Sequence, residues 1–195
     1  MLNSAIEKLI NQFQQLPGVG EKTAQRFAFF MIKQGAEKQK ELAKTLDVLN
    51  ENLHYCPQCQ NFSEGGLCQI CQNDKREQSI ICVVENIFDI LSLEKTSSYS
   101  GLYHILHGVL SPIDGIKPSD LKIEELLARI ENNPQIKEII FALSTTIEGE
   151  TTTNFISKMI PKNIKITHLA RGLPTGATLE YADEITLKLA LRERH

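Results

Sequence analysis

The sequence predicts an α/β protein built from four consecutive blocks, and three observations carry this prediction. Apolar residues recur at helical spacing up to about residue 53. A polar stretch then contains four closely spaced cysteines. From residue 79 onward, short apolar runs alternate with helical patterns, which indicates a parallel sheet covered by helices. The blocks are residues 1–53, 54–74, 79–170 and 171–195, the last being a C-terminal segment with a helix.

Three helices are predicted in the first block, separated by two glycine-containing breaks. The segment LPGVG at residues 16–20 ends the first helix, and Gly35 ends the second. The apolar stripes of the three helices are Ile6, Leu9, Ile10 and Phe13, then Ala24, Phe27, Ala28 and Met31, then Leu42, Leu46, Leu49 and Leu53.

The LPGVG segment indicates a phosphate-binding turn. Glycine adopts unusual backbone angles and lets the chain approach a phosphate closely, so Gly18 and Gly20 are candidate contacts. Their amides and the start of the next helix together form an anion site. Lys22 and Arg26 lie one helical turn apart there and would bind phosphates without regard to base sequence. The pattern resembles the helix-hairpin-helix motif of DNA-binding proteins. The alternative is a plain turn beside two solvated charges.

The second block has the spacing of a metal site. Its cysteines are Cys56, Cys59, Cys68 and Cys71, in the pattern CxxC-x8-CxxC. Each CxxC turn directs two thiolates at one ion, and four thiolates complete a tetrahedron around zinc. Because four cysteines leave no open coordination position, we predict one structural Zn2+ per chain, which would supply the folding energy that this core-poor stretch lacks. His54 is not expected to be a ligand.

The third block is expected to alternate strands with helices. The strands are predicted at residues 80–84, 103–106, 136–143 and 164–169. The helical patterns between them cover residues 86–94, 123–130 with Ser119 as the N-cap, and 155–160, ended by Pro161. Cys82 lies within the first strand and should be a small core residue. Asp183 should open the final helix.

Acidic residues gather at the carboxyl edge of this predicted sheet, where α/β folds place their sites. Glu85 ends the first strand, and Glu148 follows the third. The pattern resembles a Toprim domain, found in topoisomerases, primases and some nucleases. The resemblance implies a magnesium site made of the glutamate and a DxD pair, but Ser144 and Thr146 stand where the aspartates belong. Neutral hydroxyls lack the charge that binds a divalent ion, so we expect a retained fold without catalytic residues.

The three motifs, in this order and within 195 residues, resemble the RecR family of bacterial recombination mediators. Further matching stretches are LPGVGEKTAQRFAF, ICVVEN, HGVLSPIDGI, IEGETTTNFI and ARGLPTGATLEYADEITL. The resemblance implies a non-catalytic, ring-shaped homotetramer that clamps DNA and, with RecO and in many bacteria RecF, loads RecA during DNA repair. It also implies an interface through apolar positions such as Phe29 and Phe30.

Three charged residues are candidates for binding a partner: Glu85, Glu148 and Arg171, which follows the fourth strand. Ordinary surface charges are the alternative interpretation of the two acids. Two other functions remain open, namely a magnesium-dependent Toprim enzyme, disfavoured by the neutral residues at 144 and 146, and a protein-interaction scaffold that never touches DNA.

Composition constrains these hypotheses. The formal net charge is −3, so DNA binding would require the basic residues to be gathered on one face, as a ring of subunits could do. No apolar run approaches the roughly 20 residues that span a membrane, and the N-terminus has no signal-peptide pattern. A cytoplasmic location is therefore expected.

Overall fold

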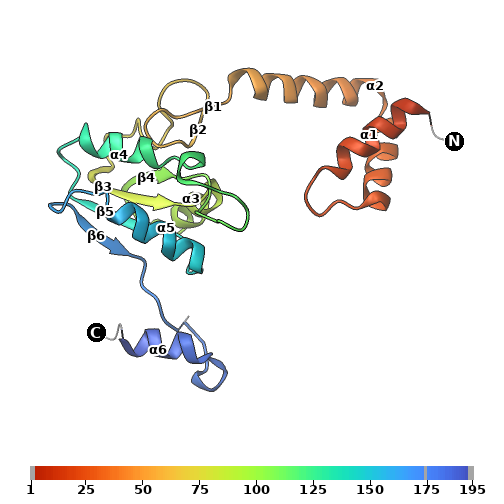
Figure 1. Cartoon of the computed structure of the whole chain (residues 1–195). Coiled ribbons are helices and arrows are strands. Elements are labelled where there is room, and N and C mark those ends of the chain that lie inside the picture. The colour runs from red at the N-terminus through yellow and green to blue at the C-terminus, as the bar shows by residue number, and fades with distance from the viewer. Residues whose placement is uncertain (1–2, 174, 193–195) are drawn as a thin grey trace. The chain divides into compact units, whose positions relative to one another are not determined.

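The structure is a computed structural model that describes residues 3–173 and 175–192 (Figure 1). It consists of two compact units, with the boundary between Leu53 and His54. Among the described residues, no helix combines the length and apolar character required to cross a membrane.

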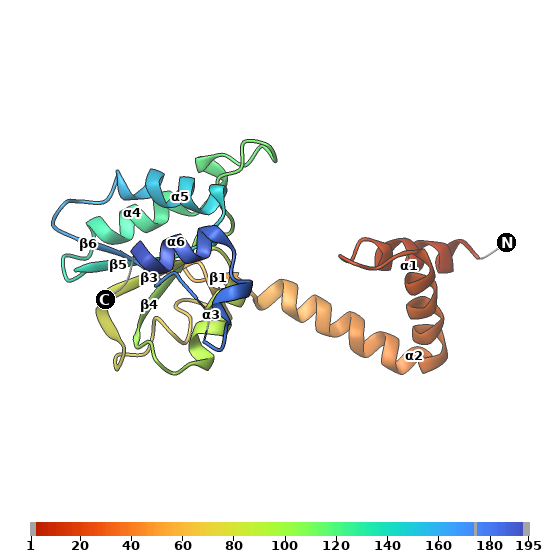
Figure 2. The ribbon, with the colours of Figure 1, turned by 90° about the horizontal axis from the view of Figure 1, so that it is seen from below.

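The N-terminal unit contains two elements. Helix α1 is Ser4–Gln14, and the side chain of Asn3 caps it by accepting a hydrogen bond from the amide of Ala5. Helix α2 is Glu21–Asn52, and it bends partway along its length (Figure 2). Gly35 interrupts it, with φ 83° and ψ 169°. Only glycine adopts such angles readily, so the predicted break at Gly35 is confirmed and α2 consists of two helical halves. Among the described residues of this unit, the buried apolar side chains are Ile10, Ala24 and Ala28.

The second unit begins with the cysteine-rich segment and continues into a parallel sheet. Strand β1, His54–Tyr55, pairs antiparallel with β2, Phe62–Ser63. The main strands are β3 Glu77–Val84, β4 Gly101–Ile105, β5 Glu138–Ala142 and β6 Lys165–His168. They are parallel and ordered β4-β3-β5-β6, which confirms the α/β class that the strand-helix alternation predicts.

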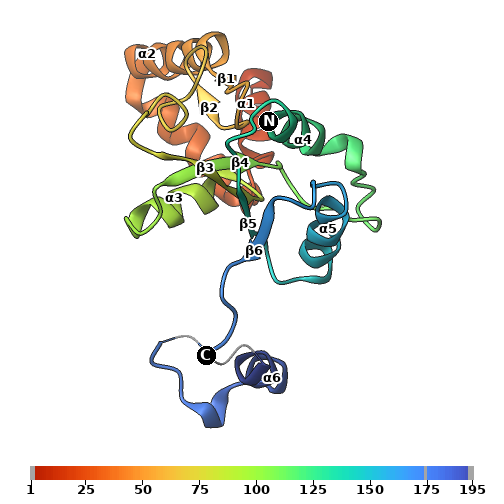
Figure 3. The ribbon, with the colours of Figure 1, turned by 90° about the vertical axis from the view of Figure 1, so that its left-hand side faces the viewer.

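Helices cover both faces of this sheet (Figure 3). They are α3 Ile87–Lys95, α4 Ile123–Glu131 and α5 Ile147–Ser157. Alternate residues of β3 enter two separate cores, because successive side chains of a strand point to opposite faces. Ile81 and Val83 lie in the core with α4 and α5, whereas Cys82 and Val84 lie in the core with α3. Burial raises the pKa of the Cys82 thiol to about 12, as suits the predicted inert core cysteine.

Short elements complete the unit. They are the 3-10 turns η1 Pro118–Asp120 and η2 Leu179–Tyr181, and helix α6 Glu184–Arg192. Asp183 accepts a hydrogen bond from the amide of Thr186, which fits its predicted place at the start of the last helix.

The predicted bounds of two helices are wrong. Ser119 is not an N-cap, because it lies inside η1, and α4 begins after Lys122 with no side-chain cap. The helix predicted around residues 155–160 is α5, which begins eight residues earlier and ends at Ser157. Its true N-cap is Thr146, whose hydroxyl accepts a hydrogen bond from the amide of Gly149 at 3.2 Å. Pro161 therefore does not set the end of this helix.

Groups from outside the sheet form hydrogen bonds with the outer edge of β4. The guanidinium of Arg76 donates to the carbonyl of Gly101 at 2.8 Å, and that of Arg129 donates to the carbonyl of Tyr103 at 2.7 Å. The amide of Ile105 donates to the carbonyl of Cys59 at 2.9 Å. The cysteine-rich segment is thereby joined to the sheet by backbone hydrogen bonding.

Candidate zinc centre and nucleic-acid interface

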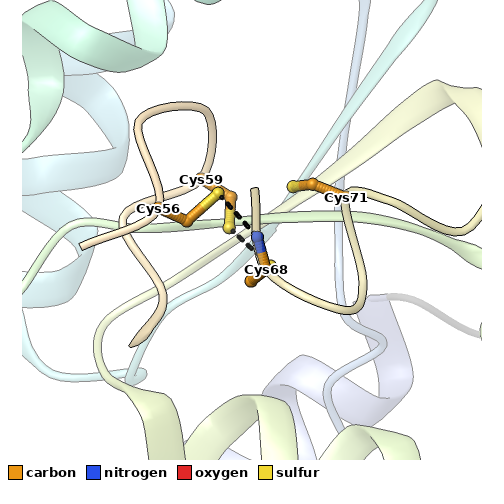
Figure 4. A group of neighbouring side chains, drawn as sticks. All are labelled: Cys56, Cys59, Cys68 and Cys71. Carbon is orange, nitrogen blue, oxygen red and sulfur yellow. Dashed lines mark hydrogen bonds between the residues drawn. The ribbon is translucent and has the colours of Figure 1, made fainter. Parts of the chain in front are cut away.

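The four predicted zinc ligands converge. Their sulfur atoms all lie within 4.8 Å of one another, and the Sγ atoms of Cys59 and Cys68 are 3.5 Å apart (Figure 4). A tetrahedron with Zn–S bonds of about 2.3 Å requires sulfur separations of about 3.8 Å, which this cluster matches. All four side chains are buried, with exposed fractions from 0% to 9%. The donor set therefore fits a closed tetrahedral site.

Both CxxC segments fold into the same turn. The amide of Gln60 donates to the carbonyl of Cys56 at 2.9 Å, and the amide of Gln72 donates to the carbonyl of Cys68 at 3.0 Å. The amide of Cys68 also donates to the sulfur of Cys56 at 3.4 Å, which joins the two CxxC turns. The repeated turn explains why two cysteines three positions apart can face one ion.

The electrostatics of the cluster suit a bound cation. A hydrogen bond with Cys68 raises the pKa of the Cys59 thiol far above its usual range, and the same bond lowers the pKa of Cys68. At Cys71 the bond with Cys59 lowers the pKa, but the bond with Cys68 and burial outweigh it and raise the value to about 12. Four neighbouring thiolates would repel one another in this buried site, and a doubly charged zinc ion relieves that repulsion.

The predicted DNA-binding turn leaves the first backbone amides of α2 without a side-chain cap. Gly18 has φ 78°, which explains the glycine there. Gly20 is the N-cap of α2, and no side chain caps the helix, so its first amides keep their donors. A Cβ built at Gly20 would meet no atom within 4 Å, and its φ of −80° is ordinary. Neither packing nor backbone geometry requires a glycine at this position.

Basic and aromatic side chains follow this turn on α2. Lys22 and Arg26 are exposed, and together with Lys33 they line a shallow groove that also contains Phe29 and Phe30. Phe29 is 42% exposed and Phe30 is 58% exposed. The structure thus places the two predicted cations beside the two predicted interface phenylalanines.

The carboxyl edge of the sheet brings the Toprim-like positions into adjacent strands. Val84 pairs with Ala142, so Glu85 and the segment entering α5 leave neighbouring strands at the same edge. The hydroxyls of Ser144 and Thr146 lie 3.3 Å apart, and Thr146 caps α5. Among the described residues, the cysteine cluster is the one set of three or more potential ligands that converges on a point.

Glu148 and Arg171 have different environments. Glu148 lies in the first turn of α5, which favours a negative charge. Arg171 forms an ion pair with Glu150, at 2.5 Å. Sequence reasoning did not select Glu150, because only folding brings the end of β6 beside α5.

Gly149 is required by packing, since a Cβ there would lie 2.0 Å from the carbonyl oxygen of Ser144.

Comparison with known families assigns most of the chain. The helix-hairpin-helix profile of RecR matches residues 6–49, and the four-cysteine zinc finger profile of RecR matches residues 53–73. A Toprim domain profile matches residues 79–170, and the RecR C-terminal profile matches residues 172–195.

Full-length relatives decide the family. The recombination protein RecR of Chloroherpeton thalassium is 47% identical over 97% of this chain and 96% of its own length. Those of Amoebophilus asiaticus and Lactobacillus acidophilus are each 46% identical over 97% of this chain, covering 94% and 96% of their own lengths. The chain belongs to the RecR family. The RecR zinc-finger match and the converging sulfurs together establish that the cofactor is one structural zinc ion held by the four cysteines.

Proposed function

We propose that this RecR-family chain is a non-catalytic DNA-binding mediator of recombinational repair, acting in the cytoplasm. It forms a ring-like homotetrameric clamp and, with RecO and RecF, helps to load RecA. Family membership supports the role in recombination, because the relatives are named recombination proteins. The helix-hairpin-helix match supports DNA binding.

The observation that carries this proposal is the geometry of the hairpin. The start of α2 lacks a side-chain cap, Gly20 has open space above it, and Lys22 and Arg26 are exposed on the same helix. Free amides, the positive end of a helix dipole and two cations are what a phosphate group requires. None of these groups reads a base, so the binding would be independent of sequence.

The salt dependence of binding tests the hairpin directly. Each phosphate neutralised by a cation contributes about 0.9 to the slope of log affinity against log salt concentration on duplex DNA. The double variant Lys22→Ala/Arg26→Ala should therefore bind more weakly and show a slope smaller by about 1.8 per engaged subunit. Charge reversal at both positions should abolish most binding.

The control for this experiment is Lys38→Ala/Lys40→Ala, which removes two exposed lysines from the second half of α2. Zinc content and oligomeric mass must match the wild type in every variant. Equal affinities and equal slopes for the hairpin variant and wild type would show that DNA binds elsewhere, or not at all.

The assembly and partner surfaces are part of the same proposal. The exposed Phe29 and Phe30 support a contact between chains, since exposed apolar clusters are typical of interfaces. Glu85, Glu148 and Arg171 remain candidates for binding a partner protein at the sheet edge. Measurement of solution mass with and without DNA tests the clamp, and a strictly monomeric protein under all conditions would exclude it.

The proposal includes an absence of catalysis. The residues at 144 and 146 carry hydroxyls, and one of them is engaged in capping α5. DNA should therefore be neither cleaved, relaxed nor primed in the presence of magnesium or manganese. Reproducible cleavage by the wild type that disappears in Glu85→Ala would support the alternative of an active Toprim enzyme.

A further inference from the structure

Three exposed rings form a continuous surface on the zinc-bearing segment. Tyr55 and Phe62 are direct cross-strand partners in β1 and β2, with ring centroids 5.5 Å apart and planes 21° apart. The ring of His107 lies 4.6 Å from that of Tyr55. Tyr55 is 51% exposed, Phe62 is 42% exposed, and His107 is exposed as well. We call these three residues the aromatic platform.

The platform is held in place by strained backbone. His107 has φ 61° and Gln60 has φ 62°, values that side chains other than glycine rarely adopt. Nε2 of His107 lies 2.8 Å from the carbonyl oxygen of Gln60, so this nitrogen is the donor. The bond joins the end of β4 to the first zinc turn and fixes the ring orientation. Backbone strain of this kind persists where the surroundings hold it and is concentrated at binding sites.

The tautomer of His107 leaves a chemically useful atom. Because Nε2 donates to a carbonyl, Nδ1 of the neutral ring carries a lone pair and can accept a hydrogen bond. An exocyclic amine of a nucleobase can donate to it. The segment 54–76 has a formal net charge of zero, because it contains two acids, Glu64 and Asp74, and two bases, Lys75 and Arg76. A phosphate backbone therefore meets no net repulsion from this segment.

A purely structural role does not account for these features. A cross-strand aromatic pair stabilises a two-stranded ribbon, but zinc and the bond from Ile105 to Cys59 already secure this one. Three adjacent exposed rings instead provide planar faces and little charge, which is the chemistry that binds unpaired bases.

We propose that the aromatic platform of Tyr55, Phe62 and His107 stacks unpaired bases of single-stranded DNA. The inference rests on the proposed DNA-binding function and adds to it a second binding site, which would contact the faces of the bases. The hairpin and the platform would then bind different parts of DNA through different interactions. The hairpin binds phosphates and depends on salt, whereas the platform binds base faces and depends on salt weakly.

Single-ring variants of the full-length, zinc-loaded protein test the platform with oligothymidine as the probe. Tyr55→Leu and Phe62→Leu should each lower affinity about tenfold without changing the salt slope, since stacking on one ring contributes on that scale. Tyr55→Phe keeps the ring and should bind like the wild type. His107→Asn removes the ring while tolerating positive φ and keeping a donor for Gln60, and it should also weaken binding.

Tyrosine fluorescence gives an independent readout, because the chain contains no tryptophan and four tyrosines. Tyr99 and Tyr103 belong to a core cluster, whereas Tyr181 is 84% exposed. In a Tyr181→Phe background, oligothymidine should quench the emission of Tyr55. Zinc content and thermal unfolding must remain unchanged in each variant.

The outcomes separate the two proposals. Wild-type affinity in the leucine variants, with no quenching, would overturn the platform while leaving the hairpin intact. A loss confined to the platform variants, with Lys22→Ala/Arg26→Ala unaffected, would overturn the hairpin and keep the platform.

Discussion

The N-terminal and the sheet-containing units differ in how completely they bury their apolar residues. Among the described residues of the first unit, three form a buried cluster, while leucines and phenylalanines along α2 remain exposed, Leu46 at 58% and Phe30 at 58%. In the described part of the second unit, fifteen buried residues form a core on one face of the sheet, and a second core lies on its other face. The second unit therefore owes its stability to its own packing and its metal. The first presents apolar surface that another chain can cover.

Of all the changes considered, metal removal should cause the largest loss of stability, and this loss should be confined to the second unit. Cys59→Ser is expected to lose the zinc ion and to unfold the turns at residues 54–74, because the metal supplies most of their folding free energy, on the order of 10 kcal/mol in small zinc modules. Hydrogen exchange should accelerate strongly in these turns and little in α1. Wild-type zinc content in Cys59→Ser would contradict the four-cysteine site.

A matched pair of leucines sharpens the comparison. Leu126 is completely buried in the sheet core, and Leu46 is exposed on α2. Leu126→Ala should lower the free energy of unfolding by about 2–5 kcal/mol, whereas Leu46→Ala should change it by about 0.5 kcal/mol or less in dilute protein. Denaturant unfolding measures both. If both variants lost the same free energy of unfolding, Leu46 would have to be buried in solution, and contact with a second copy of the chain would explain this.

Mild acid should destabilise the second unit through a buried histidine. His104 is fully buried, and burial lowers its pKa from 6.5 to about 4. Between these values the unfolded chain holds a proton that the folded chain does not, so stability falls as pH is lowered from 6.5 towards 4, by up to about 3 kcal/mol. Residues 1–53 contain no histidine and should not show this dependence.

The variant His104→Asn cannot gain this proton and should lose this part of the pH dependence. Hydrogen exchange at several pH values, with zinc content measured at each, distinguishes it from acid release of the metal. An unchanged pH profile in His104→Asn would show that another group is responsible.

Features set by local spacing were predictable from the sequence. The two CxxC turns, the break at Gly35 and the hydrophobic run of β3 depend on neighbours within a few positions. The beginning of α5 was not predicted, because its first turn, with Glu148, Gly149 and Glu150, lacks an apolar stripe. Its start depends on the Thr146 cap and on the fit of Gly149 against Ser144.

Contacts between distant segments could not be predicted at all. The bond between His107 and Gln60 joins residues 47 positions apart, and it exists only because the zinc turn lies beside the end of β4. Likewise, the pairing of Arg171 with Glu150 depends on β6 lying next to β5 in the sheet. Sequence patterns indicated that these segments exist but not which side chains meet.

The covered edge of β4 has a consequence for the fate of the protein in a crowded cell. An edge strand with free amides and carbonyls is a template on which other chains add strands and aggregate. Here Arg76, Arg129 and the first zinc turn occupy the outward groups of Gly101, Tyr103 and Ile105. Loss of zinc would loosen the first zinc turn and free the amide of Ile105, so this part of the edge would become available for pairing with another strand.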